Sequence, residues 1–107
     1  MNLQFHFQNI TEVLKDDLKE YASKRFEHLE RFVSTFQEDN KLLKVHVEHH
    51  EKHNSYELKA TLQLGGQVLH HEETTHDPKE AIDKTEANLI RQAKKHVQLM
   101  REGKQQG

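Results

Sequence analysis

The chain has no cysteine, only four glycines and a single proline among its 107 residues. Without cysteine it can form neither disulfides nor a cysteine-ligated zinc site, and it has no thiolate nucleophile. Apolar residues make up 33% of the sequence. No apolar run approaches the roughly 18 residues that a membrane span needs. Neither a phosphate-binding loop nor a nucleophile elbow is present. These absences favour a protein without catalytic activity, cofactor, membrane partner or small-molecule substrate.

The N-terminus lacks the basic stretch followed by an apolar stretch that marks a secretory signal. We therefore expect a cytoplasmic protein. Charge is abundant but balanced, with a formal net charge of -2 and an isoelectric point near 6.5. Nucleic-acid binding would therefore require basic residues gathered on one face. Protonating all ten histidines would change the formal charge from -2 to +8, so we expect any RNA affinity to rise from about pH 7.5 to 6.

Apolar periodicity predicts a strand and then a long helix. Every second residue from Leu3 to Phe7 is apolar, as in a half-buried strand. Apolar residues then recur at steps of three and four from Leu14 to Phe36, which predicts an amphipathic helix. Thr11 is a candidate N-cap, with Asp16 as a later alternative. The polar segment Gln37 to Lys41 is predicted to form a loop.

Three strand signals follow this loop. Apolar alternation predicts strands from Leu43 to Val47 and from Tyr56 to Leu64, with a turn between them at Lys52 to Ser55. Gly65-Gly66 predicts a tight hairpin turn, because glycine adopts positive φ without steric cost. The last strand, Val68 to Thr75, is mostly polar, as expected at a sheet edge.

The last helix has a well-marked start. Asp77 can cap it, Pro78 is favoured at the first helical position, and Glu80 stands at the capping-box position. We expect this helix to run to about Arg101.

The predicted order β-α-β-β-β-α indicates an α+β fold. The first helix is long enough to connect two parallel strands, and the later hairpins make antiparallel pairs. Each helix has one apolar stripe, so we expect both helices on one face of a mixed four-stranded sheet. A chain of this length forms one domain by default. We assign it to residues 1–102, with a flexible tail at 103–107.

The last helix separates apolar from basic residues. On a helical projection, one side holds Ile82, Leu89, Ala93 and Met100, and the opposite side holds Lys84, Arg91, Lys94 and Lys95, with Arg101 at its margin. Basic side chains in such a row can contact phosphates. However, amphipathic helices commonly have charged outer faces, and basic residues near a C-terminus also complement the helix dipole.

Arg25 projects inside the apolar arc of the first helix. Its stem can lie on the core while its guanidinium reaches the surface. Alternatively, the side chain points into a cleft between the helices, where RNA could reach it.

Histidines gather on the predicted strands. His46, Glu48 and His50 fall on one face of the second strand and His49 on the other. Histidines at i, i+2 on a strand can chelate a transition metal, but no spacing in the sequence fixes three ligands at one point. A histidine-rich metal-binding protein is therefore one alternative. A generic protein-interaction domain that uses the exposed sheet face is another.

Four stretches occur in a recognisable order and spacing: YASKRFEHLERF (Tyr21 to Phe32), KVHVEHHEKH (Lys44 to His53), YELKATLQLGGQVLHHEE (Tyr56 to Glu73), and HDPKEAID with IRQAKKH (His76 to Asp83 and Ile90 to His96). In these stretches the chain resembles the ribosome hibernation-promoting factors, also described as ribosome-associated inhibitors or sigma-54 modulation proteins. The resemblance implies a β-α-β-β-β-α domain similar to double-stranded-RNA-binding domains, without enzymatic activity.

The resemblance also implies a role. Such proteins sit in the decoding channel of the small ribosomal subunit, contact its rRNA and silence translation in stress or stationary phase. The family's RNA contacts match Lys24, Arg25, Arg91, Gln92, Lys94, Lys95 and His96, and the basic side of the last helix adds Lys84 and Arg101. We expect no metal or other cofactor, and a monomer off the ribosome.

The chain departs from the family pattern at several positions. Asn88 stands where lysine is common, which removes one expected phosphate contact. Pro78-Lys79-Glu80 replaces an aromatic-containing helix start, and Thr85 and Glu86 occupy positions that are usually apolar. The sequence also ends after the last helix, so we expect no ribosome pairing through the C-terminal dimerisation domain of longer members.

Overall fold

Four strands and two long helices build the fold in the predicted order. The computed structural model describes the backbone of residues 1–33 and 41–106, and the side chains of residues 1–33, 41–96, 98 and 99. The elements are β1 (Asn2–Gln8), α1 (Glu12–Glu30), β2 (Lys41–His50), the 3-10 turn η2 (Glu51–His53), β3 (Ser55–Leu64), β4 (Gln67–Thr75) and α2 (Pro78–Gln106).

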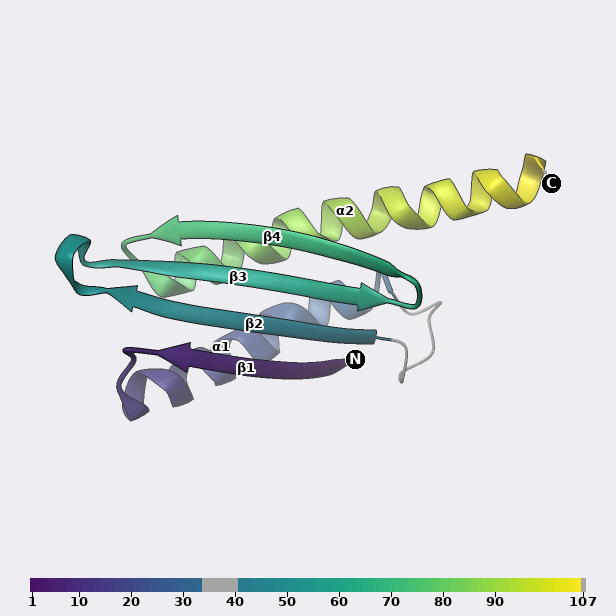
Figure 1. Ribbon diagram of the computed structural model, residues 1–107. Helices are drawn as coiled ribbons and strands as arrows, with labels where there is room; N and C mark the ends of the chain where they lie inside the picture. Colours follow the sequence, from purple (N-terminus) through teal and green to yellow (C-terminus); the bar gives the residue numbers. More distant parts are fainter. Residues whose placement is uncertain (34–40, 107) are drawn as a thin grey trace.

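The strands form one sheet in the order β1-β2-β3-β4 (Figure 1). β1 is parallel to β2, and the other two neighbouring pairs are antiparallel. The predicted mixed sheet is therefore confirmed, with α1 as the connection between the parallel strands. β4 lies at an edge, as its polar sequence predicted. At the turn before β4, Gly65 has a φ of +59°, a conformation that glycine adopts without strain.

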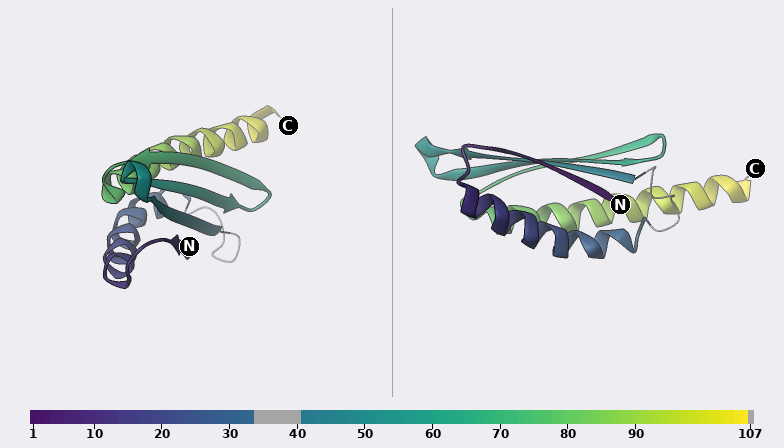
Figure 2. Two further views of the ribbon diagram at one scale, coloured as in Figure 1. Left: turned by 60° about the vertical axis from the view of Figure 1, so that its left-hand side comes forward. Right: turned by 90° about the horizontal axis from the view of Figure 1, so that it is seen from below.

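Both helices cover the same face of the sheet, and the opposite face is open (Figure 2). Alternate residues of the two central strands, such as Val45 and Ala60, are buried beneath the helices. The helices contribute their apolar stripes to this core. Ile82, Leu89 and Ala93 are buried as the helical projection predicted, whereas the side chain of Met100 lies outside the described residues.

Both helices begin at their predicted caps. The Thr11 side chain accepts a hydrogen bond from the backbone N–H of Leu14 at 3.3 Å, so the later alternative cap lies inside α1. The Asp77 carboxylate accepts one from the backbone N–H of Lys79 at 2.9 Å. These bonds satisfy backbone donors that the first turn of a helix leaves unpaired.

α1 ends at Glu30, earlier than the predicted end at Phe36. The backbone N–H of Val33 bonds to the carbonyl of Glu30 at 3.2 Å, which forms a tighter turn after the helix. Val33 is nevertheless fully buried, so the apolar periodicity continues after the helical backbone has stopped. Phe36 lies outside the described residues. Lys41, predicted to end the loop, instead begins β2.

α2 continues to Gln106, past the predicted end at Arg101, and projects beyond the sheet (Figure 1). The residues assigned to a tail are therefore helical up to Gln106. Gly103 lowers helix stability by only about 1 kcal/mol, and its neighbours are good helix formers. Within the described residues, no helix combines the length and the apolar character needed to cross a membrane.

Candidate nucleic-acid interface

Three basic side chains gather on the solvent side of α2. Arg91, Lys94 and Lys95 are all exposed, while Leu89 and Ala93 between and beside them are buried against the sheet. In the part of the chain that the structure describes, Arg91 and Lys95 pair with no carboxylate. We call Arg91, Lys94 and Lys95 the basic face. It is a concentration of positive charge on a protein whose formal net charge is -2.

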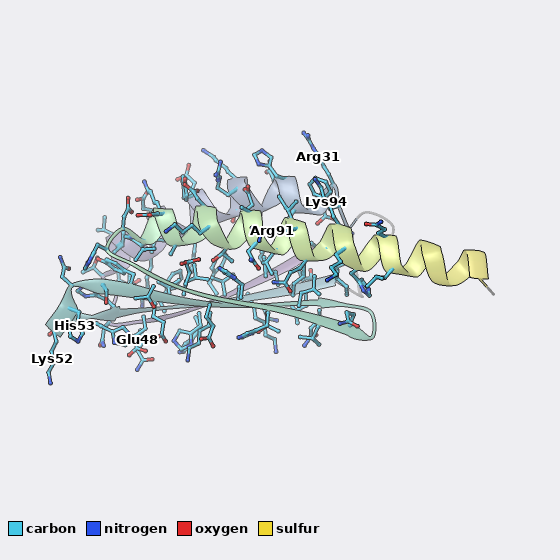
Figure 3. All side chains as sticks on the ribbon, turned by 90° about the horizontal axis from the view of Figure 1, so that it is seen from above. Arg31, Glu48, Lys52, His53, Arg91 and Lys94 are labelled. Carbon is cyan, nitrogen blue, oxygen red and sulfur yellow. The ribbon has the colours of Figure 1, made fainter. Side chains whose placement is uncertain are left out.

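The end of α1 supports the basic face. The Nζ of Lys94 lies 4.7 Å from the centroid of the Phe32 ring, a cation–π distance that fixes the position of this ammonium group. Arg31, beside Phe32 in the chain, extends from the same end of α1 (Figure 3). Sequence reasoning did not assign Arg31 to the site. Its position depends on how α1 packs against α2, and the apolar periodicity of a single helix does not predict that packing.

Two predicted contact residues carry charge that a neighbour offsets. The Nζ of Lys84 lies 3.1 Å from the carboxylate of Glu80, one helical turn away. Glu80 stands at the predicted capping-box position, and its carboxylate pairs with the Lys84 side chain. The Nζ of Lys24 lies 3.2 Å from Glu20 on α1. Both pairs are solvent-exposed, and in each a glutamate carboxylate offsets part of the lysine charge.

The partly exposed side chain of Arg25 points toward α2. Its Nε lies 2.9 Å from Asp83 Oδ1 and 3.4 Å from Glu86 Oε2. Both are ion pairs without hydrogen-bond alignment, since Arg25 Nε and Glu86 Oε2 have no hydrogen-bond partner. Of the two interpretations drawn from the sequence, the position between the helices is the observed one, with acids as the facing groups.

Further contacts extend this arrangement along the seam between the helices. The Tyr21 hydroxyl donates a 2.6 Å hydrogen bond to Asp83, which raises the pKa of Tyr21 because the bond favours the protonated phenol. His28 Nδ1 lies 3.5 Å from Glu86. We call Tyr21, Arg25, His28, Asp83 and Glu86 the interhelical network. Glu86, a departure from the family pattern, is buried at 7% exposure, and Arg25 and His28 of α1 lie beside its carboxylate.

Gln92 and Asn88 connect α2 to the edge strand. The Gln92 amide donates hydrogen bonds to the backbone carbonyl of His70 at 2.9 Å and to Asn88 Oδ1 at 2.5 Å. Asn88 therefore orients Gln92, which in turn holds α2 against β4. His96 is half-buried on the same helix, and the side chain of Arg101 lies outside the described residues. The predicted set thus divides into a compact basic face and residues that pair or pack within the protein.

The fold is similar to two solved structures. The N-terminal domain of Protein Y from Thermus thermophilus aligns with a TM-score of 0.67 and 24% identity, over 90% of this chain and 99% of that chain. A ribosomal subunit interface protein from Coxiella burnetii aligns with a TM-score of 0.65 and 16% identity, over 91% of this chain and 98% of that chain. The predicted fold class is therefore confirmed.

Sequence comparison adds the family. No curated protein sequence matches the chain. The family model described as sigma 54 modulation protein / S30EA ribosomal protein matches residues 3–101, nearly the whole sequence. The resemblance inferred from the four sequence stretches is confirmed, and the chain belongs to the sigma 54 modulation protein / S30EA ribosomal protein family.

Proposed function

We propose that this protein is a ribosome hibernation factor that binds the small ribosomal subunit and inhibits translation during stress or stationary phase. In this role it occupies the decoding channel and contacts the rRNA there. The observation that carries the proposal is the basic face, because three exposed cations lie together on a protein with a net negative charge. Family membership over residues 3–101 supports the ribosome as the partner.

Phosphate neutralisation supplies the binding free energy in this mechanism. Arg91 can hold a phosphate through two parallel hydrogen bonds, and the ammonium groups of Lys94 and Lys95 act as point charges. Recognition is of the shape and backbone of folded RNA, because side chains cannot read bases in the deep groove of an A-form helix. Each phosphate contact releases counterions. Three contacts predict that the logarithm of the binding constant falls with the logarithm of salt concentration with a slope of roughly -3.

The remaining predicted residues take different roles in this proposal. Lys84, His96 and Arg101 belong to the same helix as the basic face, and Lys24 belongs to α1. The lysine–glutamate pairs lower the contribution of Lys24 and Lys84. Arg25 holds α1 and α2 together through the interhelical network. None of these roles needs catalysis, a cofactor or a small-molecule substrate. The cytoplasm is the compartment that ribosome binding implies.

The proposal is tested by co-sedimentation of the untagged protein with purified small subunits over a range of salt concentrations. Arg91→Glu combined with Lys95→Glu should abolish binding, because it replaces two phosphate contacts with repulsion. Lys24→Glu combined with Lys84→Glu is the matched control, since it changes the net charge by the same amount at lysines that already pair with acids.

Circular dichroism establishes that both double variants remain folded. Strong binding by the Arg91→Glu, Lys95→Glu variant would refute the site. Equal loss in both double variants would show that net charge alone governs binding, which also contradicts a localised face. An in vitro translation assay with the parent protein tests the inhibitory role separately, and unchanged protein synthesis at saturating concentration would refute it.

A further inference from the structure

Three metal-ligating side chains converge on the open face of the sheet. His50 Nε2 lies 3.7 Å from Glu57 Oε2 and 4.0 Å from Glu48 Oε1. One ligand atom from each residue falls within 4.8 Å of the other two. Among the side chains that the structure describes, no other three histidine or acidic residues meet in this way. Figure 3 shows Glu48 pointing away from the helices, on the face opposite the basic face.

Strand register creates this convergence. Glu48 on β2 lies directly opposite Glu57 on β3, and His50 follows two residues later on the same face of β2. β2 and β3 are the two central strands, and Glu48 and Glu57 stand on backbone that is paired on both sides, whereas His50 is paired with β3 alone. The side chains are 26%, 33% and 38% exposed for Glu48, Glu57 and His50, which leaves an ion access from solvent.

The arrangement also has an unbalanced charge. Like charges directly opposite on neighbouring strands repel, and Glu48 and Glu57 are such a pair. Lys59 offsets part of this charge, with its Nζ 3.4 Å from Glu57 Oε1. A divalent cation among the three side chains would neutralise both carboxylates at once.

We propose that Glu48, His50 and Glu57 bind a divalent transition-metal ion of the zinc class. Zinc accepts both imidazole nitrogen and carboxylate oxygen as ligands, and water would complete the coordination. Imidazole disfavours magnesium and calcium, which prefer oxygen ligands alone. Zinc–ligand bonds of about 2.0–2.1 Å in a tetrahedron place ligand atoms roughly 3.3 Å apart. The observed separations are 3.7 and 4.0 Å from His50 to the two carboxylates, and all three ligand atoms lie within 4.8 Å of one another, so side-chain rotations are needed to close the site.

This site is independent of the proposed ribosomal role. It lies at the β2–β3 hairpin end of the open sheet face, whereas the basic face belongs to the helix layer on the other side. The bound ion would link β2 to β3 through side chains, in addition to their backbone hydrogen bonds. Occupancy should therefore stabilise the folded state, since a ligand that binds only the native protein raises the free energy of unfolding.

The test titrates untagged, chelator-treated full-length protein with zinc by isothermal calorimetry. The same chain offers a matched control on the open face, because His70 and Glu72 share the i, i+2 spacing and a 3.3 Å contact but lack a third ligand. His50→Ala with Glu57→Gln should weaken zinc binding at least tenfold. Removing a residue that only hydrogen-bonds to a metal ligand already lowers metal affinity by about tenfold or more, and removing the ligand itself should lower it at least as much. His70→Ala with Glu72→Gln should leave it unchanged.

Two further readouts distinguish a built site from adventitious binding to histidines. Cobalt bound to the parent should give the intense visible absorption of a four-coordinate ion, and the His50→Ala, Glu57→Gln variant should lose it. Zinc should raise the melting temperature of the parent and the control variant only. Absence of stoichiometric binding to the parent, or equal loss in the two double variants, would overturn the proposal. Glu57→Gln alone provides a milder variant if the double substitution fails to fold.

Discussion

Removal of the Arg25 guanidinium should weaken the fold, and the interhelical network sets the size of the effect. Arg25→Met retains an apolar stem for packing but removes the positive charge. The Glu86 side chain is only 10% exposed, and the basic side chains beside it are Arg25 at 3.4 Å and His28 at 3.5 Å. After the substitution, the Glu86 and Asp83 carboxylates face the seam without the arginine.

The magnitude follows from the burial of the partners. Removing one member of a buried ion pair costs roughly 3–5 kcal/mol, whereas exposed pairs contribute about 0–1 kcal/mol. The Arg25 side chain is 37% exposed, so solvent screens part of its charge. We therefore expect Arg25→Met to lower the free energy of unfolding by about 2 kcal/mol. For a domain of this size that corresponds to a fall in melting temperature of roughly 10 °C.

Urea denaturation followed by circular dichroism at neutral pH measures this loss. Lys24→Met is the matched control, because Lys24 forms an exposed pair with Glu20, and it should change stability by less than about 0.5 kcal/mol. Adding Glu86→Gln to Arg25→Met should restore part of the lost stability by removing the uncompensated charge. The reasoning fails if Arg25→Met stays within about 0.5 kcal/mol of the parent, or if Lys24→Met costs as much.

Two other predictions concern stability. Thr85 is fully buried and its hydroxyl has no hydrogen-bond partner, so Thr85→Val should raise the free energy of unfolding by about 1 kcal/mol. Thr85→Ser keeps the hydroxyl but loses a methyl group, so it should lower the free energy of unfolding. Urea denaturation that finds the valine variant less stable than the parent would contradict this reasoning. Burial alone would raise the pKa of Glu30, but hydrogen bonds from Lys41 and the N-terminal ammonium group hold that pKa below its ordinary value of 4.5. This contribution to stability is present above pH 4.5 and is lost as the pH falls through the lower folded-state pKa. Glu30→Gln should therefore be less stable than the parent at neutral pH and equal to it in strong acid, and a difference that persists in acid would exclude the mechanism.

The sequence predicts the elements because local rules decide them. Alternation of apolar residues marks the strands, and Thr11 and Asp77 mark the helix starts through the hydrogen bonds that their side chains can accept. The end of α1 escapes prediction because Val33 continues the apolar period into a turn. Periodicity reports which residues are buried, and it does not require that the backbone between them remain helical.

The site is only partly predictable, because its contacts cross from one element to another. Helical projection identifies Arg91 and Lys95 as solvent-facing. The acids that face Arg25 and the ring beneath Lys94 depend on the docking of α1 against α2. Glu57 likewise lies beside Glu48 and His50 because of the register between β2 and β3. The residue spacing within β2 does not predict that register.

The charge on α2 changes sign along its length. Residues 78–90 carry three acids and two lysines, whereas residues 91–106 carry five cations and one acid. A polyanion therefore attracts one half of this helix and repels the other. Electrostatic steering accelerates association when the C-terminal half of α2 approaches the polyanion first, and it does not do so in other orientations. Because the whole chain carries a net charge of -2, the protein should associate slowly with arbitrary RNA and quickly where the RNA surface accepts this one orientation.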